Sequence, residues 1–161
     1  MLKAFRTVKQ TLPDARLVIV GEGGLRAEYT QLAQSMDLQD VLFEGYVSPE
    51  LLPAYYQRAD VFCSPSTINE SFGITLLEAM AAHAPTVATT INGSNTLGEH
   101  GVTGLLVPPR DEEAMAAAAL RLLEDRALAC RLSDAAQERA QLFDWANVAG
   151  NLLDYYEELG A

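Results

Sequence analysis

The sequence contains few of the residues that metal and disulfide sites require. Only two cysteines and two histidines occur among its 161 residues. Cys63 and Cys130 lack a metal-type spacing, and His83 and His100 are equally isolated, so no metal site is predicted. Cys63 lies in the apolar run VFC, which favours a small core residue over a reactive thiol.

Basic residues are also scarce. Eleven Lys and Arg stand against 22 Asp and Glu, which gives a formal net charge of −11. This balance argues against a nucleic-acid-binding surface, which needs clustered basic side chains, and against electrostatic adhesion to anionic lipid. Because the overall field repels anions, an anionic ligand would have to be held by backbone dipoles or by a few placed cations.

Long apolar runs are missing as well. No run approaches the roughly 20 residues of a membrane-spanning helix, and no signal peptide is visible. Hydrophobic residues nevertheless make up 49% of the chain, as in a soluble globular protein with a buried core. We therefore expect a cytoplasmic protein that forms a single domain over residues 1–161.

Short β-rich runs alternate with helical patterns, which predicts a parallel sheet with crossover helices. The predicted strands are 17–21, 41–45, 60–65, 85–90 and 104–109. The predicted helices are 1–12, 24–35, 49–58, 73–83, 111–124, 127–141 and 145–159. The expected fold is α/β, with a Rossmann-like doubly wound parallel sheet of about five to six strands and a helical C-terminal part.

Three of the helices have a predicted N-cap. Ser48 precedes Pro49, which suits a first helical turn, and Asp111 and Asp144 precede two later helices. A doubly wound sheet normally opens on a strand, but none precedes the helix at 1–12. The chain is therefore expected to begin one element late.

Ligands of an open parallel sheet bind beyond the carboxyl ends of its strands. The first loop there, GEGG, places Gly23 and Gly24 as a phosphate-type turn would, although the third glycine of the dinucleotide motif is missing. It could equally be a tight strand-to-helix turn. The second loop, EGYVSPE, could lay Tyr46 and Val47 beside a planar base, or it could simply connect two elements.

The third loop, SPSTINESFG, leads into the helical run GITLLEAMAAH. Gly73 would let the backbone approach a ligand closely, and the free N–H groups of the first helical turn would attract an anion. Glu78 follows inside this apolar run, where a buried charge needs a partner. Either its side of the helix faces water, or its carboxylate accepts hydrogen bonds from the hydroxyls of a ligand.

Together these stretches resemble the nucleotide-binding half of the retaining GT-B glycosyltransferases, in particular glycosyltransferase family four (glycosyl transferases group 1). The resemblance covers essentially the whole chain. It rests on the ordered stretches LVIVGEGGLRAEY, VLFEGYVSPELLPAYYQRADVFCSPS, NESFGITLLEAMAAHAPTVATT and GVTGLLVPP, and on the late FDW. Two glutamates separated by seven residues, with an FG turn between them, are its most specific feature.

The resemblance implies a role for each matching residue. Glu78 would bind the ribose hydroxyls of a nucleoside-diphosphate sugar, and Glu70 would lie beside the donor sugar as the catalytic candidate. Further donor contacts are implied for Phe72, Gly73 and Ile74 at the helix start, for Tyr46 and Val47 at the base, and for Gly23 and Gly24 beside the cleft. The family needs no obligatory metal, so no cofactor is expected, and the full-length enzyme would work in the cytoplasm or at the inner membrane face.

Some family features have no counterpart in the sequence. Family members hold the departing diphosphate with an Arg and a Lys that precede the first helix, and neither Lys3 nor Lys9 matches that position. The amino-terminal acceptor-binding domain and the first strand are expected to be absent too. We therefore expect a donor-binding fragment with little or no transferase activity alone.

Two positions differ from the family pattern. His83 stands where a glycine usually ends the helix after Glu78, and is expected to be a left-handed C-terminal cap. Thr96 stands where many members have a glutamate, in a loop that residues 92–95 are expected to make polar. The sugar preference therefore stays open.

Two other classes of function compete with an enzyme fragment. One is a non-catalytic module that binds a nucleotide or sugar nucleotide on the same fold. The other is a flavodoxin-like signalling domain, which would need an acidic cluster and a phosphorylatable Asp that the sequence does not offer. A homodimer of the fragment is also open. It could form through the sheet edge and through three aromatic residues of the last helix, which are Trp145, Tyr155 and Tyr156.

Overall fold

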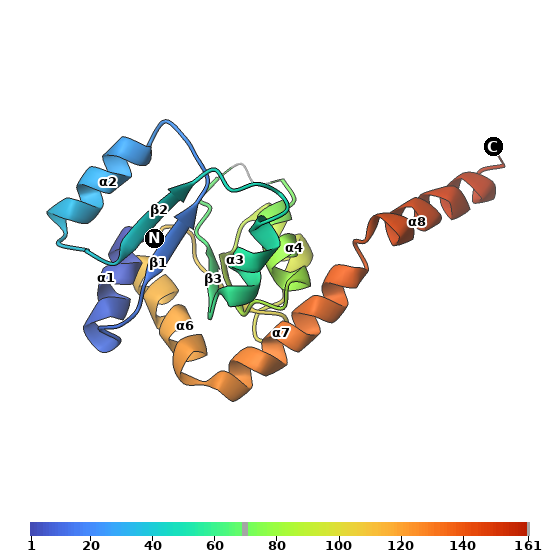
Figure 1. Cartoon of the computed structure of the whole chain (residues 1–161). Helices are drawn as coiled ribbons and strands as arrows, with labels where there is room; N and C mark the ends of the chain where they lie inside the picture. Colours follow the sequence, from blue (N-terminus) through green and yellow to red (C-terminus); the bar gives the residue numbers. More distant parts are fainter. Residues whose placement is uncertain (69–70, 161) are drawn as a thin grey trace.

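The structure is a computed structural model that describes residues 1–68 and 71–160 (Figure 1). Strands and helices alternate over the first two thirds of the chain, and helices follow. The elements are α1 (Leu2–Thr11), β1 (Leu17–Val20), α2 (Arg26–Ser35), β2 (Val41–Gly45), α3 (Leu52–Arg58), β3 (Phe62–Ser64), α4 (Ile74–Ala81), β4 (Thr86–Thr89), α5 (Asn92–Leu97), β5 (Leu105–Val107), α6 (Glu112–Glu124), α7 (Arg126–Gln141) and α8 (Trp145–Glu158).

All five predicted strands are present, and every pair of neighbouring strands is parallel. Within the described ranges they form two sheets, β1-β2 and β3-β4-β5. Both sheets rest on the same core: Leu17, Val41 and Cys63, from one strand each, pack against a buried cluster built by α1, α6, α7, β4 and β5. The predicted α/β class with a helical C-terminal part is confirmed.

The predicted helix at 49–58 begins later than expected. Two backbone N–H groups, of Leu51 and Leu52, donate to the carbonyl oxygen of Ser48 at 3.0 Å each, so this segment is a turn. The helix itself starts at Leu52, and Pro53 lies in its first turn. Ser48 is thus not the N-cap. Its side chain instead forms a hydrogen bond that lowers the pKa of Glu50.

The predicted polar loop at 92–95 is also wrong, because these residues begin the short helix α5. This helix is anchored at its far end by Leu97, which is fully buried among side chains of α4, β4 and α7. Arg139 of α7 holds the same end, since its guanidinium donates to the carbonyl oxygens of Leu97 and, at 2.9 Å, Thr96. Tertiary contacts therefore make this polar segment helical.

Other helix ends follow the sequence. The carboxylates of Asp111 and Asp144 accept hydrogen bonds from backbone N–H groups at 2.8 Å, which confirms both as N-caps. His83 has a φ of 65° and lies just past α4, as expected for a left-handed cap. Its imidazole also lies 2.7 Å from the carboxylate of Asp134 on α7.

The last helix makes little contact with the rest of the molecule. α8 has no buried residue, and Figure 1 shows it extending away from the other elements. Among the described residues, no helix is both long and apolar enough to span a membrane.

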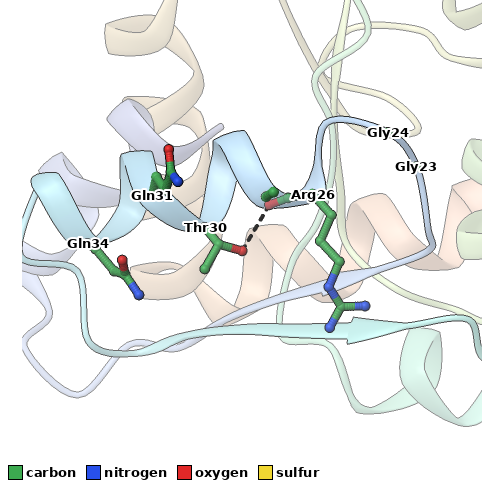
Figure 2. A pocket seen from close by; sticks show the side chains of 7 residues that line it. Gly23, Gly24, Arg26, Thr30, Gln31 and Gln34 are labelled. Carbon is green, nitrogen blue, oxygen red and sulfur yellow. Dashed lines mark hydrogen bonds between the residues drawn. The ribbon is translucent and has the colours of Figure 1, made fainter.

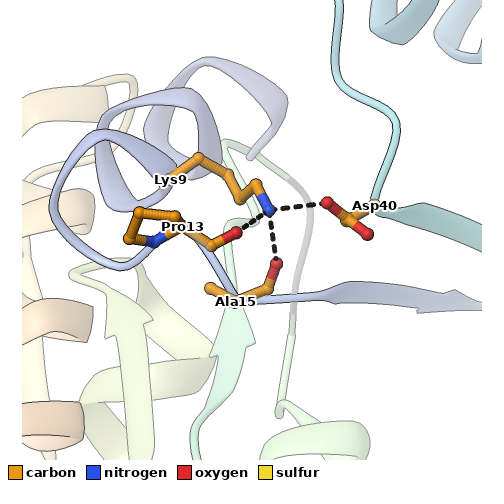
Figure 3. A network of polar contacts seen from close by, with 4 residues as sticks. All are labelled: Lys9, Pro13, Ala15 and Asp40. Carbon is orange, nitrogen blue, oxygen red and sulfur yellow. Dashed lines mark hydrogen bonds and ion pairs between the residues drawn. The ribbon is translucent and has the colours of Figure 1, made fainter.

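Lys9 connects the end of α1 to the start of both strands of the first sheet (Figure 3). Its ammonium donates to the carbonyl oxygens of Pro13 and Ala15 and lies 2.6 Å from the carboxylate of Asp40. Asp40 directly precedes β2, so this network lies at the amino ends of the strands. Lys9 is therefore at the edge opposite to the one where a nucleotide is expected.

We expect Lys9→Met to lower the free energy of unfolding at pH 7, with a smaller deficit below about pH 4. The hydrogen bond from Lys9, reinforced by its charge, lowers the pKa of Asp40. A lowered pKa stabilises the fold above the unfolded-state value, and this contribution disappears as pH falls through the folded-state value. Urea unfolding of both proteins from pH 7 to pH 3 measures this.

Lys3→Met is the matched control, because it removes the same charge from an exposed pair with Glu112. Its effect at pH 7 should be smaller, as for most surface ion pairs. A Lys9→Met deficit that stays constant down to pH 3 would contradict the assigned role of Asp40.

Candidate functional site

The start of α4 is the most specialised backbone at the carboxyl edge of the strands. Gly73 is its N-cap, is buried, and has a left-handed conformation with φ 89° and ψ 46°. Among the residues that the structure describes, no side chain caps this helix at Gly73. Since the first N–H groups of any helix lack a partner inside it, those that follow Gly73 form a local site of positive potential. Such a site attracts an anion without a cationic side chain.

Aromatic packing supports this turn from below. The rings of Phe72 and Phe143 meet edge to face, with centroids 5.6 Å apart. Both pack against the buried cluster that contains Leu76 of α4. The phenylalanine of the late FDW motif therefore helps to hold the turn, whereas the tryptophan of that motif, Trp145, is 85% exposed.

Glu78 lies on an exposed side of α4, about one turn beyond its start. Its carboxylate accepts a hydrogen bond of 2.9 Å from the hydroxyl of Tyr56 on α3. Glu70, the first glutamate of the motif, lies outside the described residues, so its position relative to Glu78 is not described.

The loop between β3 and α4 is tied to the neighbouring strand. The hydroxyl of Thr89, at the end of β4, donates to the carbonyl oxygens of Ser64, at 3.4 Å, and Ser66. These bonds hold the beginning of the third loop against the sheet. They place it at the carboxyl ends of both β3 and β4.

The first and second loops are joined to each other. The N–H of Gly21 donates to the carbonyl oxygen of Gly45 at 2.7 Å. Arg26, at the start of α2, donates to the carbonyl oxygen of Phe43 at 2.8 Å. The two loops therefore form one unit beyond the ends of β1 and β2.

Most of the site residues predicted in these two loops are exposed to solvent. Gly23 and Gly24 are exposed, Tyr46 is 70% exposed, and Val47 is half-buried. The second loop leads directly into α3, whose Tyr56 reaches Glu78. A continuous series of bonded segments thus runs from the first loop to α4. Figure 1 shows the loops that follow β1, β2 and β3 at the same upper side of the molecule.

We expect Gly45→Ala to lower the free energy of unfolding by about 1–3 kcal/mol. Gly45 has a φ of 78°, which a residue with a Cβ adopts only with strain. An added Cβ would also lie 2.7 Å from Nη1 of Arg26 and would disturb the bond of that side chain to Phe43. Chemical denaturation followed by circular dichroism measures the loss.

Gly150→Ala is the control for this change. Gly150 lies within α8, and a Cβ there would meet no atom within 4 Å. Alanine should be neutral or slightly stabilising at that position. Equal losses in the two variants would contradict the conformational requirement at Gly45.

An open hollow of about 610 Å³ lies along α2 (Figure 2). Gly23 and Gly24 border it at one end, and Thr30, Gln31 and Gln34 continue it along the helix. Figure 2 shows the Arg26 side chain directed toward the strand instead of along the hollow. No residue of α4 lines this hollow, so the hollow does not contain the expected nucleotide site.

The described residues contain no group of three or more His, Cys, Asp or Glu side chains placed to hold a metal ion. Cys63 is partly buried against the main core cluster, and desolvation there raises the pKa of its thiol to about 12. It is therefore a protonated core residue at neutral pH, as its sequence context predicts.

Sequence reasoning missed one member of this site. Tyr56 was not singled out, because the tandem tyrosines in LPAYYQRAD look like part of an ordinary amphipathic helix. Its partner Glu78 is 22 residues away, so no short motif contains both. The position of Tyr56 on the buried side of α3 was the available signal.

Comparison with known proteins identifies the family. The family model described as "Glycosyl transferases group 1" matches residues 1–139, and the chain belongs to this family. Phosphatidyl-myo-inositol mannosyltransferase of Mycobacterium leprae is 35% identical over 160 residues, which are 98% of this chain and 41% of that protein. The chain thus spans about two fifths of the length of the curated relatives it matches.

Solved structures show the same fold. Sucrose-phosphate synthase of Thermosynechococcus elongatus superposes with a TM-score of 0.85 at 34% identity, covering 98% of this chain and 42% of that one. HepE of Anabaena, solved in complex with UDP, superposes with a TM-score of 0.87 at 26% identity, covering 98% and 44%. The structure is therefore the C-terminal half of a GT-B fold.

Proposed function

We propose that this chain is the donor-binding domain of a retaining glycosyltransferase, which moves a sugar from a nucleoside-diphosphate sugar to an acceptor hydroxyl. The observation that carries the proposal is the geometry of α4. One short helix presents free N–H groups at Gly73 and an exposed carboxylate at Glu78, on the same edge of the sheet. The first group suits a diphosphate, and the second suits the paired hydroxyls of a ribose.

The remaining parts of the donor follow from this placement. The backbone N–H groups of Phe72, Gly73 and Ile74 would meet the sugar and diphosphate. Tyr46 and Val47 would contact the base, and Gly23 and Gly24 would border the cleft. The HepE structure with UDP supports a nucleotide as the ligand, since that protein is 26% identical to this chain over the aligned region.

The chemical demand on such a site is the stabilisation of the departing diphosphate. The sugar would leave through an oxocarbenium-like state, while the acceptor hydroxyl attacks with net retention at the anomeric carbon. N–H groups at the start of α4 would hold part of the developing charge. Glu70 would lie beside the sugar and is the catalytic candidate.

Two features of the structure support the proposal that this donor-binding domain requires a further domain for sugar transfer. Lys3 and Lys9 are both engaged in ion pairs, with Glu112 and Asp40, so neither is placed to hold a phosphate. Within the described ranges, β1 and β3 each have one edge without a hydrogen-bonded neighbour, although both strands pack on the same core. A further parallel strand, with the acceptor-binding domain, would complete the sheet there. Alone, the chain should transfer little or no sugar.

Calorimetric titration tests the proposal. UDP, GDP and ADP are titrated separately into the chain, with inorganic pyrophosphate as the control for simple anion binding. We expect one nucleoside diphosphate to bind selectively. Its affinity should be modest, because the Arg and Lys with which family members hold the diphosphate have no counterpart in the sequence. Equal binding of pyrophosphate and all three nucleotides, or no binding at all, would contradict a donor site. Binding of a nucleotide without any transfer when the remaining domain is supplied would favour a non-catalytic module.

A further inference from the structure

Tyr56 is held in one position by the packing of its ring. It lies on α3 and is 8% exposed. Its ring meets that of Phe62 edge to face, with centroids 5.4 Å apart, and packs beside Ala79 of α4 and Ala84. The ring therefore joins α3, β3 and α4, and its hydroxyl has a defined direction.

That direction is toward Glu78. The hydroxyl of Tyr56 donates to Oε2 of Glu78 at 2.9 Å. Burial raises the pKa of the Tyr56 phenol, and the hydrogen bond to Glu78 and the charge of that carboxylate raise it further. The phenol thus keeps its proton at neutral pH and remains a donor.

One bond from Tyr56 leaves most of the acceptor capacity of Glu78 available. A carboxylate has two oxygens and about four acceptor positions. Because Glu78 is exposed, its remaining positions are accessible from solvent. Two adjacent hydroxyls of a ligand can therefore donate to the carboxylate without displacing Tyr56.

We infer that Tyr56 is a positioning residue, which holds the Glu78 carboxylate in the orientation that receives the two ribose hydroxyls of the donor. This inference rests on the proposed function, because it takes Glu78 as the ribose-binding group. A glutamate on an exposed helix face otherwise samples several rotamers, and the ligand would have to order it. Tyr56 orders it before the ligand arrives.

The second loop gives this bond a further consequence. Tyr46 and Val47, the proposed base contacts, lie in the loop that leads into α3. The same short segment therefore carries the base contacts and the hydroxyl that orients the ribose contact. α3 therefore links the contacts proposed for the base to the contact that Glu78 of α4 is proposed to make with the ribose.

Tyr56→Phe tests the inference, because it removes the hydroxyl and keeps the ring. Tyr55→Phe is the matched control: the neighbouring hydroxyl also donates to a carboxylate, at 2.5 Å, but its partner is Glu44 and not Glu78. Each variant and the unmodified chain are titrated with UDP and with 2′,3′-dideoxy-UDP, or with the matching pair for GDP or ADP if that base is preferred. Thermal midpoints are recorded alongside.

We expect Tyr56→Phe to weaken binding of the ribonucleotide by about three- to tenfold, the cost of ordering one long side chain. Binding of the dideoxy analogue should not change, since it has no hydroxyls for Glu78 to receive. Tyr55→Phe should bind both ligands as the unmodified chain does. A purely structural role for Tyr56 would instead weaken both ligands equally.

The results separate the inference from the proposed function. If the unmodified chain does not distinguish the ribonucleotide from its dideoxy analogue, ribose recognition by Glu78 fails, and the inference fails with it. A different set of results overturns only the inference: the unmodified chain distinguishes the two ligands, Glu78→Gln abolishes that difference in affinity, and Tyr56→Phe leaves it intact.

A double variant keeps the test decisive if Tyr56→Phe lowers stability. In the Glu78→Gln background, adding Tyr56→Phe should cause no further loss of affinity for the ribonucleotide. An additional loss there would show that Tyr56 acts independently of Glu78, which would also overturn the inference.

Discussion

Glu78→Gln is expected to weaken binding of a nucleoside diphosphate by about tenfold or more. Hydrogen bonds from hydroxyls to a charged carboxylate contribute about 1.5–3 kcal/mol, and a neutral amide replaces them poorly. Glutamine has nearly the same size as glutamate, and its carbonyl can still accept the bond from Tyr56. The helix should therefore keep its structure while ribose recognition is lost. Calorimetry with the preferred nucleotide measures the change.

Glu113→Gln is the matched control. Glu113 lies on the exposed first turn of α6, and its substitution changes the net charge by the same amount as Glu78→Gln. For a chain of net charge −11, removing any one negative charge slightly reduces the repulsion of an anionic ligand. The control isolates this general effect. Equal affinities of the two variants would exclude a direct contact between Glu78 and the nucleotide.

Leu76→Ala is expected to cause the largest loss of stability, about 2–5 kcal/mol. Leu76 is 2% exposed and belongs to the cluster that joins α4 with β4, α5 and α7. Shortening it removes buried methyl groups and leaves a cavity that the surrounding elements can fill only in part. Urea unfolding followed by circular dichroism gives the free energy directly.

The same substitution on the surface provides the comparison. Leu153 of α8 is 63% exposed, and Leu153→Ala should change the free energy of unfolding by less than about 0.5 kcal/mol. Leu76 also belongs to the cluster against which Phe72, the neighbour of Gly73, packs. A Leu76→Ala protein that remains folded should therefore bind nucleotide more weakly as well. Equal stabilities of the two alanine variants would contradict the core assignment.

The strands could be predicted because each is a short apolar run bounded by Gly, Pro or Ser. The exceptions show what such patterns lack. Ser48 followed by Pro49 is a good local signal for a helix start, but the backbone uses the Ser48 carbonyl to close a turn instead. Helix α5 has no local signal, because its stability comes from the burial of Leu97 and the bonds of Arg139.

The site shows the same limit. Gly73, with its left-handed backbone at the start of α4, is where the glycine and the helical pattern predicted it. Glu78 accepts a hydrogen bond from a hydroxyl on a different helix, and periodicity within one segment cannot reveal such a contact. The donor-binding roles of all the predicted site residues remain predictions: Glu70, Glu78, Phe72, Gly73, Ile74, Gly23, Gly24, Tyr46 and Val47.

The exposure of α8 has an energetic consequence. None of its 14 residues is buried, so its internal hydrogen bonds, the Asp144 cap and one bond from Asn147 to the Gln141 carbonyl are what opposes the entropy of unwinding. A helix of this length is marginal in water, and it would exist in equilibrium with coil. A surface that covers its apolar stripe would therefore shift that equilibrium, and docking and helix formation would occur as one coupled transition.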